Sequence, residues 1–293
     1  MSGWWIMLTG SLVAISCGIL GCFLVLRRLA MVGDAISHAI LPGIVIAYLL
    51  SGSRDSLVML FGAALIGLVT VFLIQWFQNS GIPSDASIGV VFTALFSVGV
   101  ILVSLYTRQI DLDLDCVLFG EIAFVPFDRL IVGSVDIGPR AFWGLLLCFL
   151  LVATIITLFY KQFKLCSFDP ALAAALGIPV AFFHYVLMGL VSVTTVASFE
   201  SVGAILVVGL LVVPPATAYL LTDRLHVMIL LSAFIGVLST VLGYYVAYWL
   251  DASIAGCMVA VAGVLFVLAF LFSPKHGLMG RRKRLAKRMA VTV

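Results

Sequence analysis

Charged side chains are scarce in this chain. Of its 293 residues, 10% are Asp, Glu, Lys or Arg and 64% are hydrophobic, and the mean hydropathy is +1.28. Soluble domains carry about 25% charged residues, so this composition excludes an ordinary water-soluble globular protein. No polar stretch is long enough for a soluble domain of about 100 residues. We therefore expect an all-α polytopic membrane protein, with one transmembrane domain at residues 1–276 and a basic tail at 277–293.

The motifs of several enzyme and nucleotide-binding classes are also missing from the sequence. It contains no G-x-x-x-x-G-K-[ST] loop, so the chain does not itself bind ATP in that way. The H-E-x-x-H motif of zinc proteases and the G-x-S-x-G motif of hydrolases are absent as well. The six cysteines form no C-x-x-C pair, which argues against a disulfide framework and a zinc cluster. We expect no catalytic residues and no permanently bound cofactor.

Long apolar runs recur along the sequence, and a helix needs about 20 such residues to cross a bilayer. We predict about eight or nine transmembrane helices. The nine candidate spans are 4–26, 33–50, 57–77, 86–106, 141–160, two within 180–221, 227–250 and 253–272. The tail segment 281–288 holds six of the sixteen basic residues, and the positive-inside rule places it in the cytoplasm. This topology puts the N-terminus outside, and we expect no nucleic-acid partner for a tail beside a membrane span.

A carboxylate and an imidazole lie four residues apart in the second predicted span. In a helix, Asp34 and His38 share one face about 6 Å apart. Carboxylate oxygen and neutral imidazole nitrogen suit a first-row divalent metal, and ionisable groups inside a span mark an ion or substrate pathway by default. We therefore predict that this pair binds a divalent metal. The alternative is structural: Asp34 caps the start of a helix and His38 hydrogen-bonds a neighbouring helix.

Three prolines and one acid mark further positions in the spans. Pro42 follows His38 by one turn, so we predict a helix bend there. Pro214 and Pro215 are predicted to break the seventh span with a second bend. Glu200 lies near the outer surface between the sixth and seventh spans, where it is either solvent-exposed or an additional pathway ligand.

The longest segment between predicted spans, 108–140, is acidic. Its six carboxylates outnumber its three arginines, a balance that suits the outer face of the membrane. The alternating acids from Asp111 to Asp115 lack the glycine turn and distal Glu of a calcium-binding loop. We interpret the segment as solvated surface, with short or re-entrant helices at 116–131.

The segment 167–179 has the features of a short capped helix. Asp169 suits the N-cap and Pro170 the first helical position, and Gly177 suits the end of the helix. The helix, predicted at about 168–177, is too short to cross a bilayer. It is either a simple linker or a rigid element on which a cytoplasmic partner acts.

Three segments together resemble a known family. Segment 33–43 is similar to the Asp/His segment of the membrane permease subunit of bacterial ABC importers for manganese, zinc or iron, the ABC-3 type. Segment 168–177 resembles the coupling-helix region of that family, and 202–218 resembles its late, proline-broken helix. The resemblance covers nearly the whole chain.

This resemblance implies the type II ABC importer permease architecture and its partners, in a bacterial cell membrane. Two permease subunits, identical or related, would pair around a central pathway, and two cytoplasmic ATPase subunits would dock on the short helices. An extracytoplasmic metal-binding lipoprotein would deliver the ion, and ATP hydrolysis would belong to the ATPase partner. The residues implied in coupling to the ATPase are Phe168, Asp169, Pro170, Ala171, Leu176 and Gly177.

The same resemblance makes Asp34 and His38 the metal ligands of the pathway, and two copies would supply four ligands at the axis. The acidic stretch 112–121 is similar to manganese permeases, so manganese is the expected cargo. Zinc or iron permeases of the same family are alternatives, because a generic site favours zinc over manganese. Two rival functions are a gradient-driven secondary metal transporter, which would show an inverted internal repeat, and a non-transporting scaffold.

Overall fold

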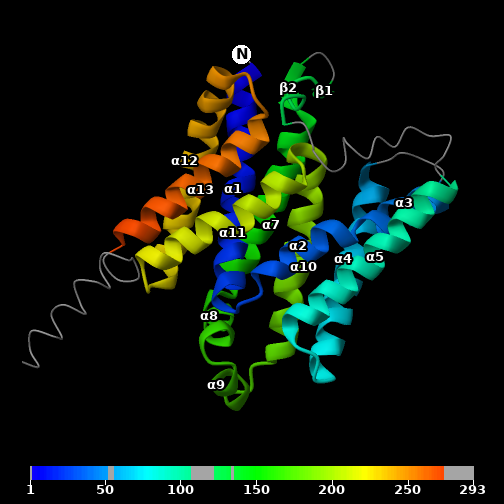
Figure 1. The fold of residues 1–293 in the computed structure, drawn as a ribbon, viewed down its shortest axis with the longest axis vertical. Helices are drawn as coiled ribbons and strands as arrows, with labels where there is room; N and C mark the ends of the chain where they lie inside the picture. The colour runs from blue at the N-terminus through cyan, green and yellow to red at the C-terminus, as the bar shows by residue number, and fades with distance from the viewer. Residues whose placement is uncertain (1, 52–55, 107–121, 133–134, 274–293) are drawn as a thin grey trace, which may run out of the picture.

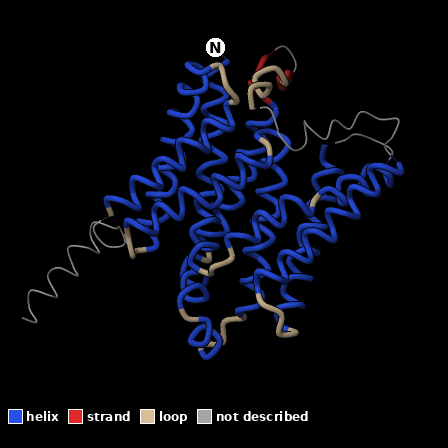
Figure 2. Tube along the Cα trace, in the orientation of Figure 1, coloured by secondary structure: helices blue, strands red, loops and turns tan. Residues whose placement is uncertain are grey.

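The structure is a computed structural model that describes residues 2–51, 56–106, 122–132 and 135–273. The predicted basic tail at 277–293 and the acidic stretch 112–121 lie outside the described residues. Helices make up nearly all of the described chain, and its strands form one short hairpin (Figures 1 and 2).

The helices follow the predicted spans closely. The helices of the described residues are α1 (Ser2–Leu26), α2 (Ala30–Ala39), α3 (Leu41–Ser51), α4 (Ser56–Asn79), α5 (Ser84–Tyr106), α7 (Arg140–Leu158), α8 (Tyr160–Phe168), α9 (Pro170–Ala175), α10 (Val180–Val202), α11 (Ala204–Leu221), α12 (Leu225–Leu250) and α13 (Ile254–Phe272). Within the described ranges, nine stretches are long and apolar enough to cross a membrane, one of them made of α2 and α3 together. The prediction of a polytopic all-α membrane protein is confirmed.

The spans form two groups that α10 joins. In the first group α1 packs against α11 and α12, and α13 covers both of these helices. In the second group α3, α4 and α5 pack together, and α2 packs against α4 and α5. Figure 1 shows the groups on opposite sides of the molecule, and α10 contacts members of both. Since 72% of the residues in its span are buried, α1 is the central helix of the first group.

The two prolines of α11 do not interrupt the helix. α11 continues through Pro214 and Pro215, so the predicted break of this span is wrong, while a bend there stays a prediction. Packed neighbours allow proline inside a membrane helix. Because Pro215 has no amide hydrogen, the Leu211 carbonyl lacks its usual helical donor. Gly21 of α1 lies directly against this carbonyl, and a Cβ at Gly21 would come within 2.6 Å of Pro215 Cγ.

A β-hairpin occupies part of the segment in which short or re-entrant helices are predicted. β1 (Arg129–Val132) and β2 (Val135–Pro139) pair antiparallel, and residues 122–127 form turns. The expectation of helices is therefore wrong for 122–131, and residues 116–121 lie outside the described chain. The β-branched Ile and Val residues of both strands explain the difference, because they favour extended backbone.

Gly21→Ala should lower the stability of the protein, because the added methyl group would collide with a backbone carbonyl that cannot rotate away. We expect a loss of about 1–3 kcal/mol from overpacking, against a gain of up to about 1 kcal/mol in helix propensity. The measurement is the midpoint of thermal unfolding of the purified protein in detergent. Gly263→Ala in α13 is the control, since nothing lies within 4 Å of its added Cβ. Equal midpoints for the two variants would contradict the close contact of α1 with α11.

Candidate functional site

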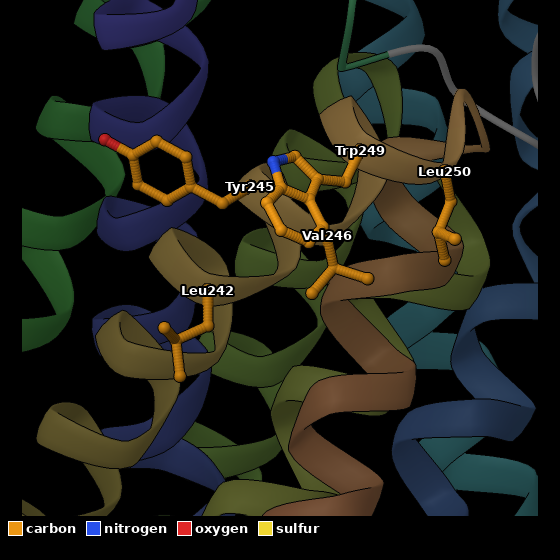
Figure 3. A pocket seen from close by; sticks show the side chains of 5 residues that line it. All are labelled: Leu242, Tyr245, Val246, Trp249 and Leu250. Atoms are coloured by element: carbon orange, nitrogen blue, oxygen red, sulfur yellow. The ribbon is translucent and has the colours of Figure 1, made fainter.

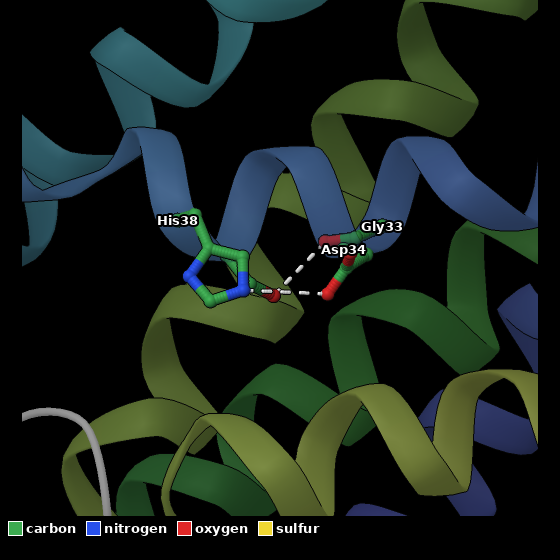
Figure 4. Close-up of polar contacts among 4 residues, drawn as sticks. Gly33, Asp34 and His38 are labelled. Carbon is green, nitrogen blue, oxygen red and sulfur yellow. Dashed lines mark hydrogen bonds and ion pairs between the residues drawn. The ribbon is translucent and has the colours of Figure 1, made fainter. Parts of the chain in front are cut away.

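α2 carries Asp34 and His38 on one side of the helix, one turn apart (Figure 4). His38 Nε2 lies 3.5 Å from Asp34 Oδ1, and the His38 and Asp34 side chains are 37% and 38% exposed. The buried residues of this helix are Val32, Gly33, Ala35, Ile36, Ser37 and Ala39. The pair is therefore the polar part of a face of α2 that its own chain leaves partly uncovered.

The start of α2 decides between the two interpretations of Asp34. The helix begins at Ala30, four residues before Asp34, and its N-cap residue Leu29 makes no side-chain capping bond. The alternative in which Asp34 caps a helix is therefore wrong. Its carboxylate contacts the His38 imidazole instead.

Two aromatic rings of α5 flank the His38 imidazole. The Phe92 ring centroid lies 5.9 Å from that of His38, and the Phe96 centroid lies 6.1 Å away. The sequence alone does not point to Phe92 and Phe96 as neighbours of His38, although their spacing of four places them on one helix face. The imidazole therefore lies between the Asp34 carboxylate and two aromatic rings of α5.

Leu211 fixes α2 against α11 at the residue before Asp34. The Leu211 Cδ2 methyl lies so close to Gly33 that any Cβ there would overlap it, and Leu211 is 2% exposed. The Ser37 hydroxyl donates a hydrogen bond of 2.9 Å to the Gly33 carbonyl. Close packing of Leu211 therefore holds α2 against α11 beside the pair.

The pair has the geometry of two ligands to one divalent ion. Metal–ligand bonds of about 2.0–2.2 Å at a tetrahedral angle separate two donor atoms by about 3.4 Å. Among the described residues, no group of three or more His, Cys, Asp or Glu could hold a metal. Glu200, the additional predicted ligand, lies in the last turn of α10, and its side chain is outside the described part of the chain, so its role stays a prediction. A metal bound by the pair would need further ligands beyond the groups found among the described residues.

The span that contains the pair is divided just beyond His38. α2 ends at Ala39 and α3 begins at Leu41. Pro42 has no amide hydrogen to donate to the His38 carbonyl, so one helical hydrogen bond is missing at this point. The helical pattern resumes where the Ile44 amide donates to the Ile40 carbonyl at 3.1 Å. The angle between α2 and α3 is therefore not held by a continuous series of hydrogen bonds.

The short helix predicted at about 168–177 is α9, which spans Pro170–Ala175. Asp169 Oδ1 accepts a hydrogen bond of 2.9 Å from the Leu172 amide, so the predicted N-cap is confirmed, and Pro170 is the first helical residue. Gly177 has φ +79°, a left-handed value that suits the end of a helix. Figure 1 shows α8 and α9 at the end of the molecule opposite the N-terminus.

Apolar side chains are exposed around α9. Phe168, Leu172 and Leu176 are 54%, 47% and 65% exposed. Of the other predicted coupling residues, Ala171 is also exposed and Pro170 begins the helix. An exposed apolar surface on a short, well-capped helix suits contact with another protein.

A shallow hollow on α12 has an apolar and aromatic lining, unlike the Asp34–His38 site. It is lined by Leu242, Tyr245, Val246, Trp249 and Leu250 (Figure 3). No carboxylate, imidazole or thiol lies among these residues, so the hollow offers no strong metal ligand. Aromatic residues at the end of a span suit the interface between the bilayer and water.

Asp169→Ala should loosen α9, because the side-chain acceptor for the Leu172 amide is lost. Removing an N-cap costs about 1 kcal/mol. Hydrogen exchange at the amides of residues 172–176 should become faster by about fivefold, while Asp169→Asn should keep nearly the wild-type rate because it retains an acceptor. Equal protection in the Ala and Asn variants would show that the cap does not stabilise this helix.

Comparisons with known proteins identify the family of the chain. The profile of the ABC 3 transport family matches residues 4–273. The chain is 56% identical over 280 residues to the manganese transport system membrane protein MntD of Bacillus subtilis (strain 168), covering 96% of this chain and 95% of MntD. It is 44% identical over 279 residues to the zinc transport system membrane protein TroD of Treponema pallidum (strain Nichols), covering 94% of this chain and 75% of TroD. The structure of PsaBC from Streptococcus pneumoniae in complex with Fab matches with a TM-score of 0.78 at 32% identity, covering 95% of this chain and 94% of that one. The chain belongs to the ABC 3 transport family.

Proposed function

We propose that the chain is the membrane permease subunit of an ATP-driven importer of a divalent transition metal, and that the metal is manganese. Its family and its relatives named for manganese and zinc transport support this assignment. The observation that supports a metal pathway at this site is the partly exposed Asp34–His38 pair inside a candidate membrane span. Zinc or iron is the alternative cargo, since an Asp/His site does not select manganese. Family membership favours ATP over an ion gradient as the energy source.

Among the described residues, the site has one carboxylate and one imidazole, and this favours a pathway between two permease copies. The pair offers two donor atoms, and Met31, which is 60% exposed, lies on the same uncovered face of α2. A second copy, identical or related, would bring its own pair to the axis and complete four ligands. Metal binding at the pair requires an ionised carboxylate and a neutral imidazole, because only these forms offer free lone pairs to the ion.

The remaining partners follow from the two ends of the molecule. On the predicted topology the N-terminal end faces outward, where a metal-binding lipoprotein would deliver the ion. The α9 end faces the cytoplasm, where the ATPase subunit would dock on Phe168, Asp169, Pro170, Ala171, Leu176 and Gly177. ATP hydrolysis belongs to that separate subunit, and this chain is a permease rather than an enzyme.

Asp34→Ala and His38→Ala should each lower metal uptake by at least about tenfold. Removing a residue that only hydrogen-bonds a metal ligand already costs about tenfold, and these two substitutions remove the proposed ligands themselves. The measurement is uptake of radiolabelled manganese by cells with the complete importer at matched membrane expression. His226→Ala is the control, because it removes an exposed imidazole near the start of α12, away from the pair. Competition by unlabelled zinc and iron(II) in the wild type identifies the preferred metal. Uptake that survives both substitutions would contradict the assigned pathway.

Leu176→Ala should weaken the association of the ATPase with the permease, because it removes the most exposed apolar side chain next to α9. Truncating a central interface side chain costs about 1–2 kcal/mol, or about tenfold in affinity. The measurement is the dissociation constant of the purified ATPase for the permease in detergent. Ile82→Ala, in the turn between α4 and α5, is the control, since Ile82 is also exposed but lies outside the predicted docking residues. Equal dissociation constants would contradict docking on α9.

A further inference from the structure

We propose that a hydrogen bond between Arg27 and Ser167 transmits movement of α9 to α2, which makes Arg27 a positioning residue for metal transport. This inference rests on the proposed function and adds a connection between its two ends. The ATPase would act at α9, whereas the Asp34–His38 pair lies on α2. These two helices are far apart in the sequence, so a physical contact must join them.

Arg27 supplies that contact at the turn between α1 and α2. Its Nε donates a hydrogen bond of 3.0 Å to Ser167 Oγ, and the Ser167 hydroxyl donates one of 2.7 Å to the Phe163 carbonyl. Ser167 belongs to α8 and lies two residues before Asp169, the N-cap of α9. Arg27 lies three residues before the start of α2 and seven before Asp34. One hydrogen bond thus joins the helix before α9 to the turn that leads into the helix carrying the pair.

The junction between α8 and α9 is suited to transmit movement. Only Asp169 separates the two helices, and its amide donates to the Leu165 carbonyl of α8 while its carboxylate accepts from Leu172 of α9. The helices also pack against each other. A displacement of α9 therefore carries α8 with it.

Buried aromatic rings support the same path. Phe163 of α8 contacts Phe23 of α1 with a centroid distance of 5.9 Å and Phe183 of α10 at 5.3 Å. Phe23 and Phe163 are fully buried. Well-packed cores deform little, so α8 and the end of α1 move together.

The turn after Arg27 is short and hydrogen-bonded. The Arg27 amide donates to the Phe23 carbonyl and the Leu29 amide to the Leu24 carbonyl. The Val32 amide of α2 then donates to the Leu29 carbonyl. These hydrogen bonds restrict the backbone of the turn between Arg27 and α2. A displacement of Arg27 therefore reaches the first turn of α2.

Burying the Arg27 guanidinium costs free energy, because one of its nitrogens is left without a hydrogen bond to the described residues. Its Nη2 nitrogen is buried and has no hydrogen-bond partner among the described residues. Burial lowers the pKa of Arg27, since the charged form loses hydration. An apolar side chain would fill such a place more favourably. A second conformation in which Nη2 gains a hydrogen-bond acceptor would recover the free energy lost by burying it unpaired. A contact that transmits movement between helices requires two such conformations.

The test uses the complete importer, with its ATPase and metal-binding protein, reconstituted in proteoliposomes. Two quantities are measured together: import of radiolabelled manganese(II) and release of inorganic phosphate. Arg27→Met keeps the length of the side chain and removes its donors. Arg28→Met is the matched control, because it removes the same charge from the neighbouring residue, which is exposed.

Arg27→Met should lower the manganese imported per ATP hydrolysed by about fivefold, the lower end of typical coupling energies. Hydrolysis should persist, and Arg28→Met should keep the wild-type ratio. Arg27→Lys should restore less than half of the loss, because an ammonium keeps the charge but not the Nε geometry. Ser167→Ala, a milder change, should also lower the ratio. The double variant with Arg27→Met and Ser167→Ala should import as much manganese per ATP as Arg27→Met alone, because both substitutions remove the same hydrogen bond.

A purely structural role for Arg27 would lower import and hydrolysis together and leave their ratio unchanged, and that result would overturn the inference. So would full rescue by Arg27→Lys, or equal ratios for Arg27→Met and Arg28→Met. If wild type itself imported no manganese, or Asp34→Ala imported it normally, the proposed function would fail. If wild type imports manganese and Asp34→Ala does not, an unchanged ratio in the Arg27 and Ser167 variants would refute this inference alone.

Discussion

The packing of Leu211 against two glycines is the contact on which the arrangement of this molecule depends. Its carbonyl, which Pro215 leaves without a helical donor, lies against Gly21 of α1. Its side chain lies against Gly33 of α2, directly before Asp34. Membrane helices associate through close packing rather than through a hydrophobic driving force, and glycine allows the closest approach. Leu211 of α11 therefore contacts both the central helix and the helix that bears the site.

That packing presents ionisable groups where a bilayer makes them costly. Asp34 and His38 contact each other and the α5 rings, yet more than a third of each side chain remains exposed. A chain that needed the pair only for its own stability would enclose it completely, because polar groups in hydrocarbon are expensive. The exposed face instead suits an ion and a second permease copy, and the interruption after His38 leaves α2 free to change its angle to α3.

The α9 end of the molecule and the Asp34–His38 pair suit different physical tasks. The α9 end combines a well-formed N-cap with exposed apolar side chains, which suits a surface that another protein pushes. The Asp34–His38 pair needs the opposite, a fixed geometry that changes only when a helix moves. The Arg27–Ser167 hydrogen bond and the Phe23–Phe163 contact lie between them, where α8 meets α1. Transport in this view depends on how stiffly α8 joins α9 to the turn before α2.

The sequence by itself determined the features that depend on neighbouring residues. The nine spans follow from the length of apolar runs, the facing of Asp34 and His38 from helical periodicity, and the cap of α9 from Asp169 and Pro170. The hairpin in place of helices at 129–131 was not predicted, although its β-branched residues favour strands. The uninterrupted α11 was not predicted either, because packed neighbours allow proline inside a membrane helix. Only the tertiary structure decided that Phe92 and Phe96 flank His38, that Leu211 lies between two glycines and that Arg27 reaches Ser167. The physical reason is that these contacts join residues far apart in the chain, and they exist only once the helices have packed.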